Sequence, residues 1–273
     1  MNSWMLNLGI CLALLLGAYT FLQSERPWLR RIGVWLIFAS IGAAAWFITD
    51  SWVVVAVSLL CWFIIPVVQA AYLSRTLRFS RESALTPGTL QEQDLEELRI
   101  ITGELRELDF VLDRDYWLEP SPVRHGFRLF QHREKPVYAA ISVIRQGQFS
   151  LLFLQFVTID EQGNYWITWD FPLSYNMKMP PELQVYRCLE AHDSAELFSQ
   201  HEEYLRLNEV HPHNGEQLPE APQFFNRINE AMIRYNLHIG MLRHYPQASG
   251  QIGYSWRGTW YLSRKVLWEM VAG

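Results

Sequence analysis

The fold is decided by residues 32–73, which read IGVWLIFASIGAAAWFITDSWVVVAVSLLCWFIIPVVQAAYL. These 42 residues hold one charged side chain, Asp50, inside the short polar sequence Thr49-Asp50-Ser51. A helix needs roughly 17–25 apolar residues to cross the hydrocarbon of a bilayer, so the stretch is too long for one crossing and fits two helices joined by a tight turn. A further apolar run occupies residues 4–22. The sequence therefore predicts a membrane anchor over residues 1–73, with spans at about 4–22, 32–48 and 52–73.

The arginines that flank these runs predict how the anchor is oriented. Basic residues near the ends of membrane helices collect on the cytoplasmic side. The N-terminus and the 49–51 turn have no basic residue. The arginines follow the first run and the third, and they are Arg26, Arg30, Arg31, Arg75, Arg78 and Arg81. We therefore expect an integral protein of the inner or plasma membrane, with its N-terminus outside and its C-terminal part in the cytoplasm. The first run lacks the basic start of a cleaved signal peptide, so we expect it to be retained.

The composition of the predicted spans indicates an anchor rather than a transport path. They contain no charged side chain, and such groups usually mark an ion or proton route. The second span offers small residues such as Gly33, Ala39 and Ala43, which let helices approach closely. These residues predict packing within the three-helix unit, with a homodimer seam as the alternative.

The remaining chain is acidic. Of the 23 basic and 28 acidic side chains, only three and two lie in residues 1–73, which leaves 20 basic and 26 acidic groups for residues 74–273. This balance excludes the basic surface of a non-specific nucleic-acid binder. The three cysteines, Cys11, Cys61 and Cys188, have neither disulfide nor zinc-site spacing.

Residues 74–88 are predicted to be a linker, followed by a cytoplasmic α+β domain over residues 89–273. Thr89 and Glu92 have capping-box spacing, which predicts a helix over residues 90–108. Runs rich in β-branched and aromatic residues then alternate with short loops that contain glycine or proline, which predicts antiparallel hairpins. We expect a β-meander of four to six strands, packed with amphipathic helices, from the segments 110–118, 126–132, 137–145, 149–159, 165–171 and 184–190.

Three further helices are predicted, and the role of two of them stays open. Residues 194–207 follow a helix-start sequence. Apolar residues in the next helix recur at heptad spacing, at Phe225, Ile228, Met232, Tyr235, Ile239 and Leu242. This spacing favours half-buried packing, with a dimer seam as the alternative. The tryptophan-rich helix 259–271 either closes the domain core, which we favour, or lies in the membrane interface.

The strongest local signal for chemistry is a cluster of histidines and acids. Imidazole and carboxylate are common zinc or iron ligands, and Glu190, His192 and His201 are the weak metal-site candidates. No recognised ligand spacing supports them. Cys188 and His192 would stand ~13 Å apart on a strand, too far for nucleophile and base to touch. No catalytic residue is assigned, and no cofactor motif is present, so no cofactor is predicted.

The sequence thus predicts a membrane-anchored cytoplasmic interaction or sensing module without an evident catalytic motif. Its expected partners are the lipid bilayer, through residues 1–73, and either another protein or a second copy of the chain; nucleic acid is not among them. The alternative is a membrane-bound enzyme or small-ligand receptor with a site between the sheet and the helices, where such pockets commonly form.

Overall fold

The computed structural model describes residues 3–24, 26–81, 83–90, 96–121, 124–146, 149–171, 177–213, 220–245 and 250–272. The chain forms two compact units. The first combines Met1–Leu77 with Tyr254–Gly273, and the second is Arg78–Gly253. The chain therefore leaves the first unit once and returns to it at the end. This division differs from the predicted domain bounds, because residues 254–273 group with the N-terminal helices and not with the sheet.

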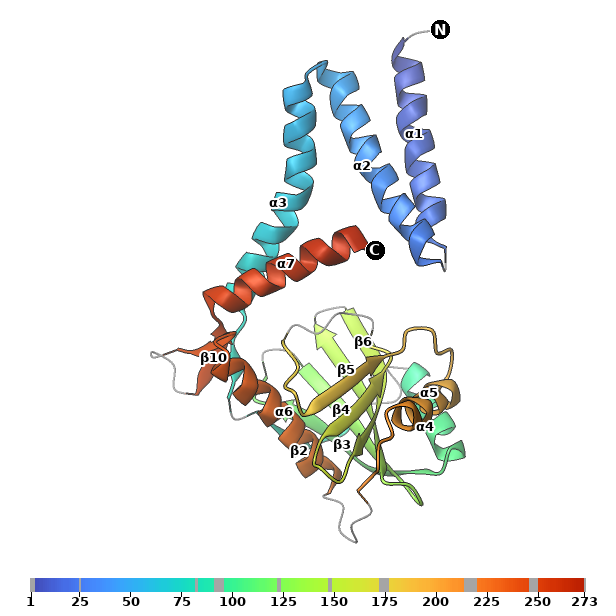
Figure 1. The fold of residues 1–273 in the computed structure, drawn as a ribbon, viewed down its shortest axis with the longest axis vertical. Helices are drawn as coiled ribbons and strands as arrows, with labels where there is room; N and C mark the ends of the chain where they lie inside the picture. The colour runs from blue at the N-terminus through green and yellow to red at the C-terminus, as the bar shows by residue number, and fades with distance from the viewer. Residues whose placement is uncertain are drawn as a thin grey trace. The chain divides into compact units, whose positions relative to one another are not determined.

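The first three helices of unit 1 are long and apolar. They are α1 (Ser3–Leu22), α2 (Pro27–Thr49) and α3 (Trp52–Thr76), shown in blue and cyan in Figure 1. Each is long and apolar enough to cross a membrane, and few of its residues are buried in the protein alone. This exposure suggests that the three helices are embedded in a bilayer.

Small residues of α2 face α1, as the sequence predicts. A Cβ atom at Gly33 would meet the carbonyl oxygen of Ala18 at 2.9 Å, so only glycine permits this approach. About two turns further along α2, the Ser40 hydroxyl is buried and donates a hydrogen bond to the Cys11 carbonyl oxygen at 3.5 Å. At the α2–α3 turn, Asp50 adopts the left-handed conformation with φ 50°, which a short polar side chain tolerates.

The fourth helix of unit 1, α7 (Trp256–Ala272), packs against α3. Its start is fixed by Ser255, whose hydroxyl accepts a hydrogen bond from the Gly258 N–H at 3.1 Å. The prediction that its tryptophans close the core of the sheet domain is wrong, since Trp256, Trp260 and Trp268 are exposed. Periodicity places residues on one helical face but does not say what that face meets.

Unit 2 is built on a seven-stranded sheet with the order β2-β3-β4-β5-β6-β7-β8. The strands are β2 (Ala84–Pro87), β3 (Phe110–Glu119), β4 (Arg124–His132), β5 (Val137–Gln146), β6 (Phe149–Ile159), β7 (Tyr165–Trp169) and β8 (Leu183–Arg187). The predicted α+β class and antiparallel meander are confirmed from β3 to β7. Strand β2 forms within the predicted linker, and β8 pairs with β7 in parallel.

Helices cover both faces of this sheet, and Figure 1 shows α4 and α5 together, with α6 apart from them. Helices α4 (Glu96–Glu107) and α5 (Ser194–Leu207) pack on one face, which we call face A, around Leu98, Phe156 and Leu197. The α5 bounds match the prediction. The predicted start of α4, with its Thr89–Glu92 capping box, involves residues 91–95, which lie outside the described residues.

The other face, face B, is covered by α6 (Ala221–His238). The heptad positions Phe225 and Met232 are buried against the sheet of their own domain, so they are not available as a dimer seam. The predicted helix also ends earlier, because Ile239 caps α6 and Leu242 begins strand β9 (Leu242–His244).

A second, three-stranded sheet joins the two ends of unit 2. Its order is β1-β10-β9, with β1 (Phe79–Ser80) and β10 (Gln251–Tyr254) antiparallel and Phe79 opposite Ile252. The strand that leaves unit 1 is therefore paired with the strand that returns to it.

Candidate functional site

His201, one of the three predicted metal-site candidates, lies on α5 and is buried between that helix and face A. Its Nε2 is 2.9 Å from the Thr158 hydroxyl on β6, and its Nδ1 is 2.9 Å from the Thr168 hydroxyl on β7. Burial lowers the pKa of His201 to about 3, so the ring is neutral near pH 7. The two threonine hydroxyls occupy both ring nitrogens. This histidine holds α5 on the sheet and is not placed to bind a metal.

The other two candidates do not join His201. Glu190 is exposed, and His192 lines a pocket beside the start of α5. Within the part of the chain that the structure describes, no three His, Cys, Asp or Glu side chains gather as a metal site would require. Cys188 is buried in the core of face A, which agrees with its interpretation as a small apolar side chain.

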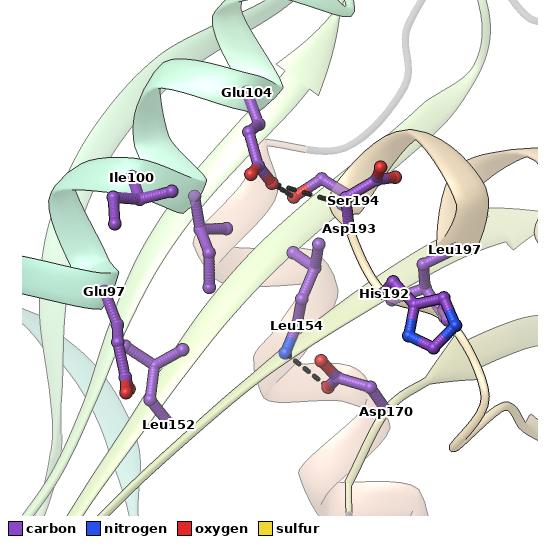
Figure 2. A pocket seen from close by; sticks show the side chains of 12 residues that line it. Glu97, Ile100, Glu104, Leu152, Leu154, Asp170, His192, Asp193, Ser194 and Leu197 are labelled. Carbon is purple, nitrogen blue, oxygen red and sulfur yellow. Dashed lines mark hydrogen bonds between the residues drawn. The ribbon is translucent and has the colours of Figure 1, made fainter.

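The pocket that His192 lines has a volume of about 300 Å³ and lies between α4, strand β6 and the start of α5 (Figure 2). Its apolar lining comes from Ile100, Ile101, Leu152, Leu154, Ala191 and Leu197. Its polar lining comes from Glu97, Glu104, Asp170, His192, Asp193 and Ser194. An apolar wall with a few polar groups is the usual composition of a binding site.

Hydrogen bonds to Glu104 fix one side of the pocket. The Glu104 carboxylate accepts from the Ser194 N–H at 3.1 Å and from the Ser194 hydroxyl at 2.5 Å, as Figure 2 shows. Asp193 caps α5 by accepting from the Glu196 N–H at 2.7 Å. These contacts tie α4 to the first turn of α5, so the pocket is bordered by connected elements.

Asp170 borders the pocket at the end of β7. Its Oδ1 accepts a hydrogen bond from the Leu154 N–H at 2.7 Å, and its own N–H donates to the Leu154 carbonyl oxygen at 3.2 Å. Burial raises the pKa of Asp170 above the usual range of an aspartate, more than these backbone hydrogen bonds lower it. A cation brought next to this carboxylate would reverse part of that effect.

The lining contains four carboxyl groups and one imidazole, and no lysine or arginine lies among its described residues. The arrangement is suited to a group that is apolar along its length and positive at its end. Among the described lining residues no set of metal ligands is present, and the one hydroxyl that meets a carboxylate, that of Ser194 with Glu104, joins α5 to α4.

Sequence reasoning missed this pocket, although part of the signal was present. Glu97 and Glu104 are seven residues apart, which places both on one face of α4. Asp170 ends the alternating run of β7. These residues line one pocket with His192 although they come from segments far apart in the chain, and no spacing along the sequence reveals such an arrangement.

Comparison of this chain with known protein families, with curated proteins and with solved structures finds no match. The function is therefore inferred from the pocket of unit 2 and from the apolar helices of unit 1.

Proposed function

We propose that the protein is a multi-pass membrane protein whose cytoplasmic domain binds a partner. Support for the topology comes from three apolar helices of crossing length and from arginines that follow α1 and α3. Cysteine-accessibility labelling of intact cells tests the orientation. A cysteine placed at position 50 should react with an impermeant reagent from outside, and one at position 207 should not; the reverse pattern would overturn the orientation.

The pocket carries the proposed binding role. Its carboxylates and apolar wall favour a partner that presents a lysine or arginine side chain, with the methylene stem on the wall and the charge at Asp170, while Glu97, from α4, adds a second negative charge to the lining. We infer an interaction module and not a catalyst, because a binding function requires only this complementarity.

The test uses the full chain in detergent and a fluorescent lysine-rich peptide, with the same peptide fully acetylated on its lysines as the neutral control. We expect the unmodified peptide to bind and the acetylated one to lose affinity. Asp170→Asn and Glu97→Gln should each weaken binding by about tenfold, equivalent to ~1.4 kcal/mol. Glu230→Gln, which removes an exposed charge on α6, is the matched control and should leave binding unchanged. Equal affinity for both peptides, or an equal loss with Glu230→Gln, would contradict the proposal.

One observation favours a second candidate, a small-ligand receptor or enzyme. Asp170, with its raised pKa, and His192 line the same pocket, and perturbed titratable groups in a cleft are common at functional sites. Native mass spectrometry of the full chain tests this candidate. A co-purified mass that disappears in Asp170→Asn and persists in Glu230→Gln would favour it over the interaction module.

A further inference from the structure

Helix α7 has two faces of opposite character. One face, with Gly258, Thr259 and Ser263, is buried. Thr259 receives a hydrogen bond at 3.1 Å from the hydroxyl of Ser74, which lies in the last turn of α3 and is 1% exposed. A polar pair buried between the two helices fixes α7 to the end of α3.

The opposite face is aromatic and basic. At 100° per residue, a sector about 120° wide contains Trp256, Trp260, Arg264, Arg257 and Trp268. The three indoles are 71%, 63% and 72% exposed, and both arginines are exposed. Three large aromatic side chains left in water on one helical face are unusual, because their burial is strongly favourable.

What covers this face follows from the position of the helix. α7 is attached to the last turns of α3, at the end of an apolar segment long enough to cross a bilayer. The Arg75 guanidinium of that same turn lies 5.2 Å from the centre of the Trp256 ring. Tryptophan with arginine is the side-chain combination found at the boundary between headgroups and acyl chains.

We propose that α7 lies in the interface of the bilayer that α3 crosses, with its three tryptophans among the lipids and Arg257 and Arg264 at the phosphates of anionic lipids. This inference rests on the proposed function in one respect, namely that α3 spans the membrane. The arginines attract the negative surface of the cytoplasmic leaflet, and the tryptophans set the depth of the helix.

The experiment compares three single-cysteine variants of the full chain, each carrying an environment-sensitive fluorophore. The first retains Cys61, which is exposed on α3. The second carries Trp260→Cys and the third Leu207→Cys, a position 67% exposed at the end of α5. In each, the other native cysteines are replaced by alanine. Each protein is reconstituted twice into vesicles of phosphatidylcholine with a minority of phosphatidylglycerol. One preparation contains a lipid spin-labelled near the headgroup end of the acyl chain, and the other a lipid spin-labelled near its terminal methyl, because position 61 lies near the middle of α3.

We expect quenching and a blue-shifted emission at positions 61 and 260, and neither effect at position 207. Quenching at 61 without quenching at 260 would overturn the interfacial placement of α7 and leave the membrane anchor standing. Absence of quenching at 61 would instead overturn the anchor. A blue shift at 260 without lipid quenching would mean that a protein surface, such as a second copy of the chain, covers the helix, and would also overturn the proposal.

A second comparison tests the arginines. With Arg257→Gln and Arg264→Gln in the Trp260→Cys background, the increase in quenching produced by phosphatidylglycerol should be lost. Each arginine near an anionic surface changes the interfacial partition by about fivefold. Glu230→Gln in the same background is the matched control, and an unchanged phosphatidylglycerol effect in the arginine variant would contradict the role of anionic lipid.

Discussion

Arg128 and His201 are buried against face A with hydrogen-bond partners, whereas His125 and Ser142 are buried on face B without one among the described residues. On face A, the Arg128 guanidinium meets the Asp115 carboxylate at 2.7 and 2.9 Å, and the same carboxylate accepts from the Leu90 N–H at 2.9 Å. His201 bonds to two threonines. On face B, the His125 Nε2 and the Ser142 hydroxyl are buried without a hydrogen-bond partner in the described ranges. Since an unpaired buried polar group lowers stability, removing Arg128 or His201 should weaken the domain, whereas replacing His125 by an apolar residue should strengthen it.

The largest effect is expected from Arg128→Met. It leaves the Asp115 carboxylate buried next to an apolar side chain, which should lower the free energy of unfolding by about 3–5 kcal/mol. Urea unfolding of the full chain in detergent, followed by proteolysis of unit 2, measures the change. Arg99→Met is the control, because its pair with Glu96 is exposed at 3.6 Å. The double variant Arg128→Met with Asp115→Asn removes the buried charge, keeps an acceptor for the Leu90 N–H and should recover much of the loss; no recovery would show that the unpaired charge is not the cause.

Acid should act through His201. Its pKa in the folded protein is about 3 and in the unfolded chain about 6.5, so the unfolded state binds the proton first as the pH falls. Stability is therefore full above pH ~6.5 and should decrease by on the order of 3 kcal/mol by pH 4. His201→Gln keeps a donor and an acceptor for the two threonines and should show a shallower pH dependence in unfolding experiments. The same slope in both proteins would refute this source of acid sensitivity.

His125→Phe should raise the free energy of unfolding, whereas Arg128→Met should lower it. The His125 ring lies 4.1 Å from the Phe127 ring, and burial lowers its pKa to about 4. Phenylalanine keeps the aromatic contact and removes the unpaired nitrogen, so unfolding should become harder by about 1 kcal/mol, with a larger gain at acid pH. Thermal unfolding at pH 7 and pH 5 gives both values. A destabilised variant would mean that the nitrogen has a partner in the native protein.

The smallest effect is expected at the rim of face A. Lys135 pairs with Glu202 and lies 5.0 Å from the Phe198 ring, but the lysine and glutamate side chains are both 45% exposed. Lys135→Gln should change the unfolding free energy by at most about 1 kcal/mol, and added salt should reduce the difference. An effect as large as that of Arg128→Met would erase the distinction between buried and exposed pairs.

The sequence predicts individual helices and strands well, but it predicts less well which other elements each of them packs against. The alternation in residues 165–171 and the cap at Asp193 are local signals, and β7 and α5 form where these signals place them. The parallel pairing of β8 and the attachment of α7 to α3 depend on where a long connection leads. Such placement is set by the packing of distant segments and leaves no periodic signal in the chain.

The candidate site is likewise predictable from the sequence only in part. Residue type predicts His192 and His201 equally as site residues, but His192 lines a pocket and His201 is a core residue. What separates them is the pair of threonines on β6 and β7, which come from two strands and meet only in the folded sheet. Chemical type identifies candidates, and only tertiary contacts decide which of them reach a cavity.

The pairing of β1 with β10 gives the protein the connectivity of a domain insertion. Residues opposite each other in an antiparallel pair have Cα atoms about 4.5–5.5 Å apart, so Phe79 and Ile252 lie within reach of a very short loop. Unit 2 could therefore be excised and the ends of unit 1 rejoined by a few glycine and serine residues, leaving α3 followed directly by α7. The same closeness permits circular permutation of unit 2, with its present ends joined and new ends opened in another loop.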